Sequence, residues 1–162
     1  MNIFYNLFTE EGGKEMQYKW FYFKTSPRGK SKFGVADNPW GRLRCFQQGT
    51  DEELFLDHLW VISSRNSIFS AVETELKHMY KDQCLLLETN RAGHTEWFQE
   101  VNPKYFDKQL TKLVKLAGGR IQKIKLKKPY AATRRSDCPL KFPTQKHEQE
   151  QWFKEFWSKI DQ

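Results

Sequence analysis

The chain has few cysteines and no long apolar run, so it lacks the features typical of disulfide-bonded secreted proteins and of membrane proteins. It has three cysteines, Cys45, Cys84 and Cys138, and their odd number and wide spacing argue against a disulfide framework. No two of them lie at zinc-finger spacing. No apolar run approaches about 20 residues, so we expect no membrane-spanning segment. The first residues lack a basic start followed by an apolar run, and we therefore expect no secretory signal and a cytoplasmic protein.

Acidic residues are scarce in the last third of the chain, and this scarcity sets the charge of the protein. Of the 162 residues, 27 are Lys or Arg and 20 are Asp or Glu, which gives a net charge of +7. Residues 101–162 hold 15 basic and 6 acidic side chains, whereas residues 1–100 hold 12 and 14. A concentrated positive charge favours an acidic partner such as a nucleic acid.

An aromatic hairpin followed by a short helix forms the centre of the sequence. Residues 19–25 are rich in aromatic side chains, residues 32–36 form a second short run, and Pro, Gly and Ser residues separate the two. This pattern predicts a β-hairpin. Residues 39–48 are then expected to form a helix, because an Asn precedes them at the N-cap position, a Pro begins them and a Gly follows them.

Two further segments complete the predicted core. Residues 54–62 have the length and the β-forming composition of a strand, and residues 68–80 repeat apolar side chains with helical period. Residues 85–87 are three leucines, which suit either a strand or a buried turn. The expected fold is α/β (α+β): a small, mainly antiparallel three-stranded sheet flanked by helices.

Glu73 stands at the margin of the apolar stripe of the helix predicted over residues 68–80. A carboxylate beside a core-facing stripe is expected to be paired or functional, because burying it alone is costly. From periodicity alone the pairing partner would be an arginine.

The basic third of the chain is predicted to form a helical C-terminal extension. Residues 103–117 have helical period and end at a Gly pair, and residues 120–128 suit either a basic strand or an extended arm. Residues 145–160 carry an aromatic stripe expected to dock onto the domain or onto another protomer. Basic side chains of this extension, together with one of the helix at 39–48, are predicted to bind nucleic acid: Arg44, Lys112, Lys115, Arg120, Lys123, Lys125, Lys127, Lys128, Arg134 and Arg135.

These segments divide the chain into three parts. Residues 1–17 are expected to be an N-terminal extension, residues 18–102 the folded domain, and residues 103–162 the basic extension that binds nucleic acid or docks onto the domain. The oligomeric state is left open.

The order of four motifs resembles the GIY-YIG nuclease family. Trp20-Phe21-Tyr22 stands where the first triad of that family lies, and Lys32-Phe33-Gly34 stands at the second triad. Arg42 matches the arginine of the following helix, and Glu73 matches the glutamate of a later helix. The segment Glu96-Trp97-Phe98 is similar to a phage-rich branch of the family in which Lys begins the second triad. The resemblance covers residues 18–100.

The resemblance implies a role for each matched residue. Tyr22 would help to activate the nucleophile, Arg42 would hold the scissile phosphate, and Glu73 would bind a divalent metal, Mg²⁺ or Mn²⁺. Lys32 would supply positive charge or assist proton transfer. The chain departs from the wider family at Phe46, where a His or Tyr is common.

The asparagine found late in the family's fold has two candidates in this chain, Asn90 and Asn102. With the motifs above, the resemblance implies a metal-dependent DNA endonuclease, and the similarity to the phage-rich branch indicates a phage origin, although RNA also suits such a site. One alternative is a catalytically inactive protein that binds DNA or inhibits a nuclease. A third is a structural protein whose basic segment binds any polyanion.

Overall fold

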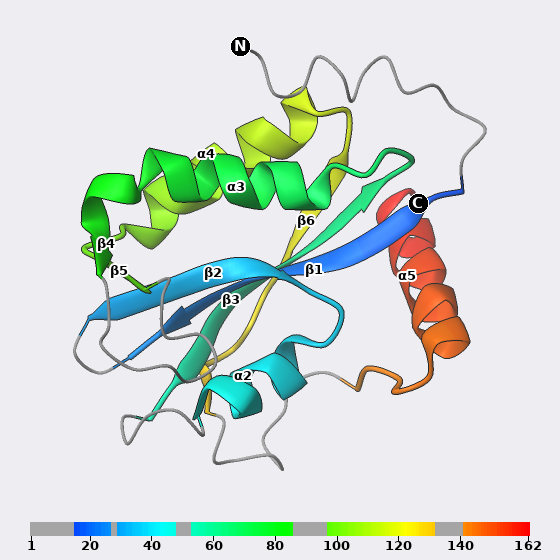
Figure 1. Ribbon diagram of the computed structural model, residues 1–162. Coiled ribbons are helices and arrows are strands. Elements are labelled where there is room, and N and C mark those ends of the chain that lie inside the picture. The colour runs from blue at the N-terminus through cyan, green and yellow to red at the C-terminus, as the bar shows by residue number, and fades with distance from the viewer. Residues whose placement is uncertain (1–14, 27–28, 48–52, 86–96, 132–140) are drawn as a thin grey trace.

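The computed structural model describes residues 15–26, 29–47, 53–85, 97–131 and 141–162 (Figure 1). The elements in chain order are β1 (Gln17–Thr25), β2 (Lys30–Ala36), α2 (Pro39–Gln47), β3 (Phe55–Ser64), α3 (Phe69–Met79), the short 3₁₀ helix η1 (Lys81–Gln83), β4 (Cys84–Leu85), β5 (Trp97–Gln99), α4 (Pro103–Leu116), β6 (Arg120–Ile124), β7 (Tyr130–Ala131) and α5 (Lys146–Ile160). Within these ranges no helix is both long enough and apolar enough to cross a bilayer.

The strands form one sheet of seven strands in the order β4-β5-β2-β1-β3-β6, with β7 pairing the other end of β3. All of the pairs are antiparallel. The predicted mixed fold with an antiparallel sheet flanked by helices is therefore confirmed, but the prediction of three strands is wrong. The additional strands contain two to five residues each, which is too short for a clear alternation of apolar and polar side chains.

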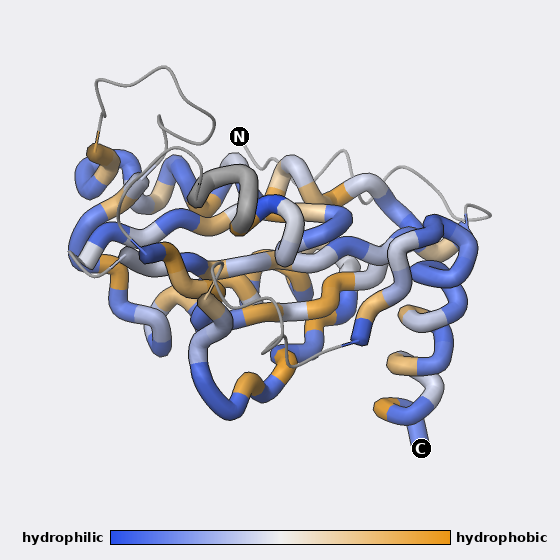
Figure 2. The backbone as a smooth tube through the Cα atoms, turned by 90° about the horizontal axis from the view of Figure 1, so that it is seen from below, coloured by the Kyte–Doolittle hydropathy of each residue, from blue (hydrophilic) through white to orange (hydrophobic). Residues whose placement is uncertain are grey.

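Strand β1 lies at the centre of the sheet and is buried on both faces. Phe21 and Phe23 point into one core, whereas Trp20 and Tyr22 point into the other, as the two-residue period of a strand requires. Figure 2 shows the hydrophobic residues running through the central strands. Because both faces are apolar, the sheet needs a helical layer on each side.

Helices α3 and α4 cover the first face, and Figure 1 shows both on the same side of the sheet. The ring of Phe106 in α4 is fully buried and lies 5.0 Å from that of Phe23 and 4.7 Å from that of Phe33, measured between centroids. Helix α4 begins at Asn102, whose side chain accepts hydrogen bonds from the backbone N–H groups of Lys104 and Tyr105. Asn102, one candidate for the late asparagine, is thus a helix cap.

Helices α2 and α5 lie against the second face. The aromatic stripe of α5 packs on β1, with Phe153 stacked at 5.2 Å on Tyr18 and with Phe153 and Trp157 both buried. Arg120 of β6 lies 4.3 Å above the Trp157 ring and forms a two-pronged ion pair with Asp161. The stripe therefore docks onto its own domain, which decides between the two possibilities left by the sequence.

The predicted boundary between residues 102 and 103 falls inside this architecture. Elements after it share the sheet and both cores: β6 and β7 pair with β3, α4 packs on one face and α5 on the other. The segment at 120–128, for which the sequence allowed a strand or an arm, contains the strand β6. Of the predicted N-terminal extension, residues 1–14 lie outside the described residues, and Gln17 already begins β1.

This arrangement predicts that α4 is essential to stability. Phe106→Ala should lower the free energy of unfolding by about 3–5 kcal/mol, because it removes a fully buried ring from the first core. Tyr105→Ala is the matched control, since its side chain is 59% exposed, and it should change stability by less than about 0.5 kcal/mol. Chemical denaturation followed by circular dichroism measures both. Equal, small losses would show that α4 is not part of the folded core.

Candidate active site and basic surface

The hydroxyl of Tyr22 and the carboxylate of Glu73 meet beside Gly34. Gly34 lies directly opposite Tyr22 in the β1–β2 hairpin. A Cβ atom on Gly34 would lie 2.1 Å from Glu73 Oε1 and 3.0 Å from the Tyr22 hydroxyl oxygen. The missing side chain of Gly34 therefore provides the space that both groups occupy. Three of the predicted site elements, namely the first triad, the second triad and the helix glutamate, converge at this point.

Glu73 reaches this point from the other side of the sheet. Helix α3 packs on the first core, and the Glu73 side chain extends to the edge of β2, where its Oε1 accepts a 2.8 Å hydrogen bond from the backbone N–H of Val35. Its Oε2 lies 3.7 Å from Lys77 Nζ, one turn along the same helix. Its cationic partner is thus a lysine, where periodicity alone suggested an arginine. The side chain is 23% exposed, so solvent reaches the carboxylate.

Two lysines share the Tyr22 face of the hairpin. Lys32, the predicted second-triad residue, is opposite Lys24, and both are almost completely buried. Lys24 Nζ lies 4.0 Å from the centre of the Tyr22 ring. Lys24 is not among the site residues predicted from the sequence. Its position two residues after Tyr22 in a strand places it on the same face, and that spacing is the signal that was available.

Arg42 projects from α2 on the same side of the sheet as Tyr22. The helix begins at Asn38, whose side chain accepts a 3.0 Å hydrogen bond from the Gly41 N–H, so the predicted N-cap is confirmed. Trp40 and Leu43 bury α2 against the second core, while Arg42 is exposed. Arg44 belongs to α2 by its backbone, and its side chain lies outside the described part, as does that of Phe46.

The donor set suits a divalent ion held by few protein ligands. Across the described ranges, no group of three or more His, Cys, Asp and Glu side chains comes together. Mg²⁺ keeps several waters and is often held by one or two carboxylates together with phosphate oxygens. Glu73 is oriented by Val35 through one oxygen, and its other oxygen is available except for the long contact with Lys77. This single carboxylate fits the role that the resemblance implies.

An irregularity in the β1–β3 pairing lies beside Lys24. Phe23 pairs with His58 and Lys24 with Leu56, so Asp57 is the extra residue of a bulge. Thr25 Oγ1 donates a 2.6 Å hydrogen bond to Asp57 Oδ2. Burial raises the pKa of the Asp57 carboxyl, an effect that the hydrogen bonds from Thr25 partly oppose.

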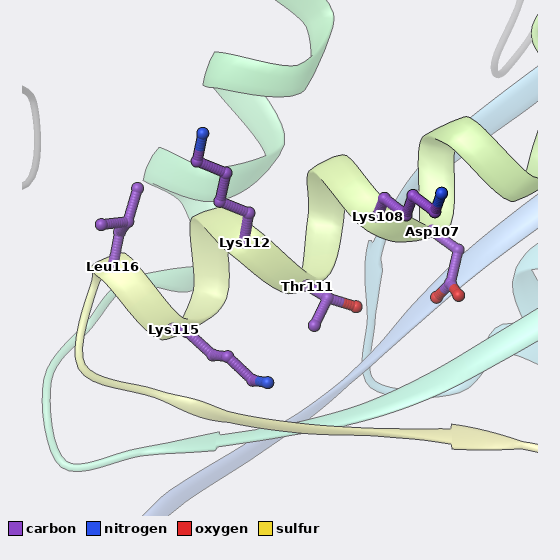
Figure 3. Close-up of a pocket in the computed structure, with 6 residues that line it drawn as sticks. All are labelled: Asp107, Lys108, Thr111, Lys112, Lys115 and Leu116. Carbon is purple, nitrogen blue, oxygen red and sulfur yellow. The ribbon is translucent and has the colours of Figure 1, made fainter.

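The first face of the sheet carries a separate basic surface. A hollow of about 580 Å³ is lined by Asp107, Lys108, Thr111, Lys112, Lys115 and Leu116, all from α4. Figure 3 shows Thr111 and Lys115 projecting to one side of the helix and Lys112 to the other. Asp107 accepts a 2.7 Å hydrogen bond from the Trp60 indole N–H. The Lys123 ammonium lies 5.6 Å from the Trp60 ring centre, which adds a cation from β6 next to the helix.

The charge of this surface also acts on His58. Burial lowers the pKa of this imidazole, and the positive charge of Lys123 lowers it further, while Asp107 partly offsets both effects. His58 is therefore expected to be neutral at pH 7. The cations of the basic surface are Lys108, Lys112, Lys115 and Lys123.

The structure separates the predicted nucleic-acid-binding residues into groups. Lys112, Lys115 and Lys123 lie with α4 on the first face, opposite to the face of Tyr22. Arg120 turns to the second face, where Asp161 and Trp157 engage its guanidinium. The remaining residues are Lys125, Lys127 and Lys128, which are exposed beyond the end of β6, and Arg134 and Arg135, which lie outside the described residues, as do Asn90 and Glu96.

Comparison with known proteins adds no relative. No protein-family model, curated protein or solved structure matches this chain. A function for this chain is therefore inferred from its residues and their geometry.

The convergence at Gly34 generates a prediction. Gly34→Ala should displace Glu73 and Tyr22 and lower stability by about 1–3 kcal/mol, because the new methyl group overlaps the carboxylate. Gly41→Ala is the control: its Cβ would meet the Asn38 side chain at 3.4 Å, an ordinary contact, and alanine suits a helix better than glycine. Thermal unfolding of both variants measures the difference. A Gly34→Ala protein as stable as Gly41→Ala would mean that the two groups do not occupy this space in solution.

Proposed function

We propose that the protein is a metal-dependent endonuclease of the GIY-YIG type that hydrolyses phosphodiester bonds in DNA. The observation that carries this proposal is the convergence of the Tyr22 hydroxyl and the Glu73 carboxylate beside Gly34. The Tyr22 side chain points to the second face of the sheet, whereas Glu73 belongs to a helix that covers the first face, and the two groups meet at the position that the resemblance assigns to the reaction. The low cysteine content suits an enzyme that works in the cytoplasm, including that of a host cell if a phage encodes it.

Each residue has a chemical task in this proposal. The Tyr22 oxygen, in its phenolate form, accepts a proton from the attacking water and becomes a neutral phenol, and the Arg42 guanidinium binds two oxygens of the scissile phosphate. Lys32 neutralises charge that develops on the phosphate. Glu73 would hold Mg²⁺ or Mn²⁺ through its available oxygen, with the orientation fixed by the Val35 N–H. When bound, such an ion stabilises negative charge on the phosphate and on the leaving oxygen.

The role of Glu73 is tested by Glu73→Gln. Nicking of supercoiled plasmid in Mg²⁺ should fall by at least about 100-fold, because the amide is a poor ligand for a hard cation. Stability in chelator should change by less than about 1 kcal/mol, since the amide oxygen can still accept the Val35 hydrogen bond and the Lys77 pair is partly solvated. Plasmid nicking and thermal unfolding are measured on the same preparation.

Glu75→Gln is the matched control for this experiment. Glu75 lies on the same helix but points to another side, so nicking should stay within about twofold of the parental rate. A folded Glu73→Gln protein that nicks as fast as the parent would contradict the assignment. Parallel incubation with single-stranded RNA tells whether DNA or RNA is the substrate.

The position of the basic surface favours a second candidate function. Lys108, Lys112, Lys115 and Lys123 lie on the face away from Tyr22, so they form a polyanion-binding surface that does not require the site at Gly34. A protein that binds DNA, or inhibits a nuclease, without cleavage would use this surface alone. Binding without metal-dependent nicking would support this candidate, and equal affinity for any polyanion would support a purely electrostatic role.

Salt dependence measures the contribution of this surface. Combined Ala substitution of Lys112, Lys115 and Lys123 should flatten the log–log dependence of the DNA association constant on salt by about 0.9 per lost phosphate contact. The control substitutes Lys146, Lys154 and Lys159, which are exposed side chains of α5, the helix that covers the second face. This change removes the same amount of positive charge. Fluorescence anisotropy with a labelled duplex gives both slopes. Identical slopes for the two triple variants would show that net charge, rather than this surface, determines binding.

A further inference from the structure

We propose that DNA passes from the α4 surface to the face of Tyr22 along three exposed lysines, Lys125, Lys127 and Lys128, and that the passing segment is single-stranded. We refer to these three residues as the edge lysines. The substrate class is then DNA with an unpaired segment, and not a continuous duplex. The consequence for cleavage rests on the proposed nuclease function, whereas the binding path does not.

The edge lysines lie between two strands that pair with β3. Strand β6 pairs with β3 from Leu59 to Ser63, and β7 pairs with Phe55 and Leu56. The residues between β6 and β7 therefore run along the outer side of β3, level with the bulge in its pairing with β1. Figure 1 shows this segment in yellow, leaving the end of α4 and running past β3 towards α2.

This segment connects the two faces of the sheet. It begins beside Lys123, whose ammonium lies near Trp60 on the first face, within the basic surface. It ends at Tyr130, which is buried in the second core with its ring 5.9 Å from that of Trp40. Trp40 belongs to α2, the helix that carries Arg42. The edge lysines thus lie between the basic surface and the helix of the predicted phosphate-binding arginine.

The far end of the segment is close to the candidate site. Leu56 pairs with Tyr130 of β7 on one side and with Lys24 of β1 on the other. Two strand spacings, about 10 Å, therefore separate β7 from β1 at this level, and Tyr22 is two residues farther along β1. DNA that leaves the edge lysines on this side arrives at the face on which Tyr22 and Arg42 lie.

The segment carries charge of one sign only. All three edge lysines are exposed, and residues 118–131 include no Asp or Glu. Ile124 and Leu126 alternate with lysines and pack against the second core, so the backbone is held while the ammonium groups stay in solvent. Cations spaced along an anchored backbone are what a protein needs to follow a DNA strand without reading its sequence.

The stiffness of duplex DNA favours a single strand on this path. The α4 lysines and Tyr22 lie on opposite faces of the sheet, so DNA that contacts both must turn around the sheet within the width of one small domain. Duplex DNA has a persistence length of about 150 base pairs and resists such a turn. A single strand is flexible and is commonly bound in a positively charged groove that follows its backbone. We therefore expect a duplex to reach the α4 surface alone.

The test compares the binding of a labelled single strand of about 30 nucleotides with that of a blunt duplex of the same length. Fluorescence anisotropy is measured in chelator, so that no cleavage occurs. The single strand should bind at least about tenfold more tightly, because it reaches more cations. Combined Ala substitution of the edge lysines should lower single-strand affinity by at least about tenfold and leave duplex affinity within about twofold.

The matched control is the triple Ala variant of Lys146, Lys154 and Lys159, which loses the same charge and should keep the preference for the single strand. Equal affinity of the parental protein for both probes would overturn the proposal. An edge-lysine variant that binds both probes more weakly to the same extent would also overturn it. Lysines at a sheet edge can instead prevent pairing with another chain. In that case the variant should aggregate while its monomer keeps full single-strand affinity, which would contradict the path.

Cleavage in Mg²⁺ separates this proposal from the nuclease function. A duplex with a single-stranded tail should be cut within the tail, and a linear blunt duplex at least about tenfold more slowly. Supercoiled plasmid remains a substrate, because negative supercoiling favours unpaired strands. If single-strand preference is found without cleavage, the nuclease function fails and the path stands. If the blunt duplex is cut as fast as the tailed one, the nuclease function stands and the path is overturned.

Discussion

Burial of strand β1 on both faces is the constraint on which the rest of the structure depends. Its alternating side chains, Phe21 and Phe23 against Trp20 and Tyr22, are all less than 5% exposed. Such a strand cannot lie at an edge, so it must be paired on both sides, here by β2 and β3. Each face then needs its own helical cover, and the last helix of the chain, α5, completes one of the two cores. The position of Tyr22 and that of Lys24 follow from the same alternation.

The parts of the fold that the sequence predicted are those with a clear local signal. Helices α3, α4 and α5 have apolar side chains at helical spacing, α2 has an N-cap, a starting Pro and a following Gly, and the hairpin and β3 have the composition of strands bounded by turn residues. The two-residue strands β4 and β7 have too few positions to show one. Strand β6, with the sequence Arg-Ile-Gln-Lys-Ile, has charged residues at two of its five positions and gains its order from pairing with β3. That pairing is nonlocal, so no short window of the sequence contains it.

The site shows a similar division. The sequence placed the two triads on the two strands of one hairpin and Glu73 at the margin of its helical stripe, while the pairing of Tyr22 with Gly34 is seen only in the structure. The burial of Lys24 could not be predicted. The two-residue period of a strand indicates on which face of the sheet a lysine lies, but not how deeply that face is buried. Nor could the sequence tell that Lys115 and Arg120 turn to opposite faces. In the sequence, a run of like charges suggests a single surface. Only the folded structure shows that its members lie on different faces of the sheet.

The α4 lysines and Tyr22 lie on opposite faces of the sheet, and the edge of β2 is where the two faces are connected. Strand β5 pairs with β2 at Lys30 and Ser31, and farther along the same edge the Val35 N–H is taken by Glu73. Glu73 belongs to a helix on the face of the α4 lysines, yet its carboxylate reaches the Tyr22 hydroxyl beside Gly34. The side chain thus joins the two faces around this edge. A nucleic acid held by the α4 lysines and cut beside Tyr22 would also have to pass from one face to the other, whereas one bound only by the lysines would have no reason to do so.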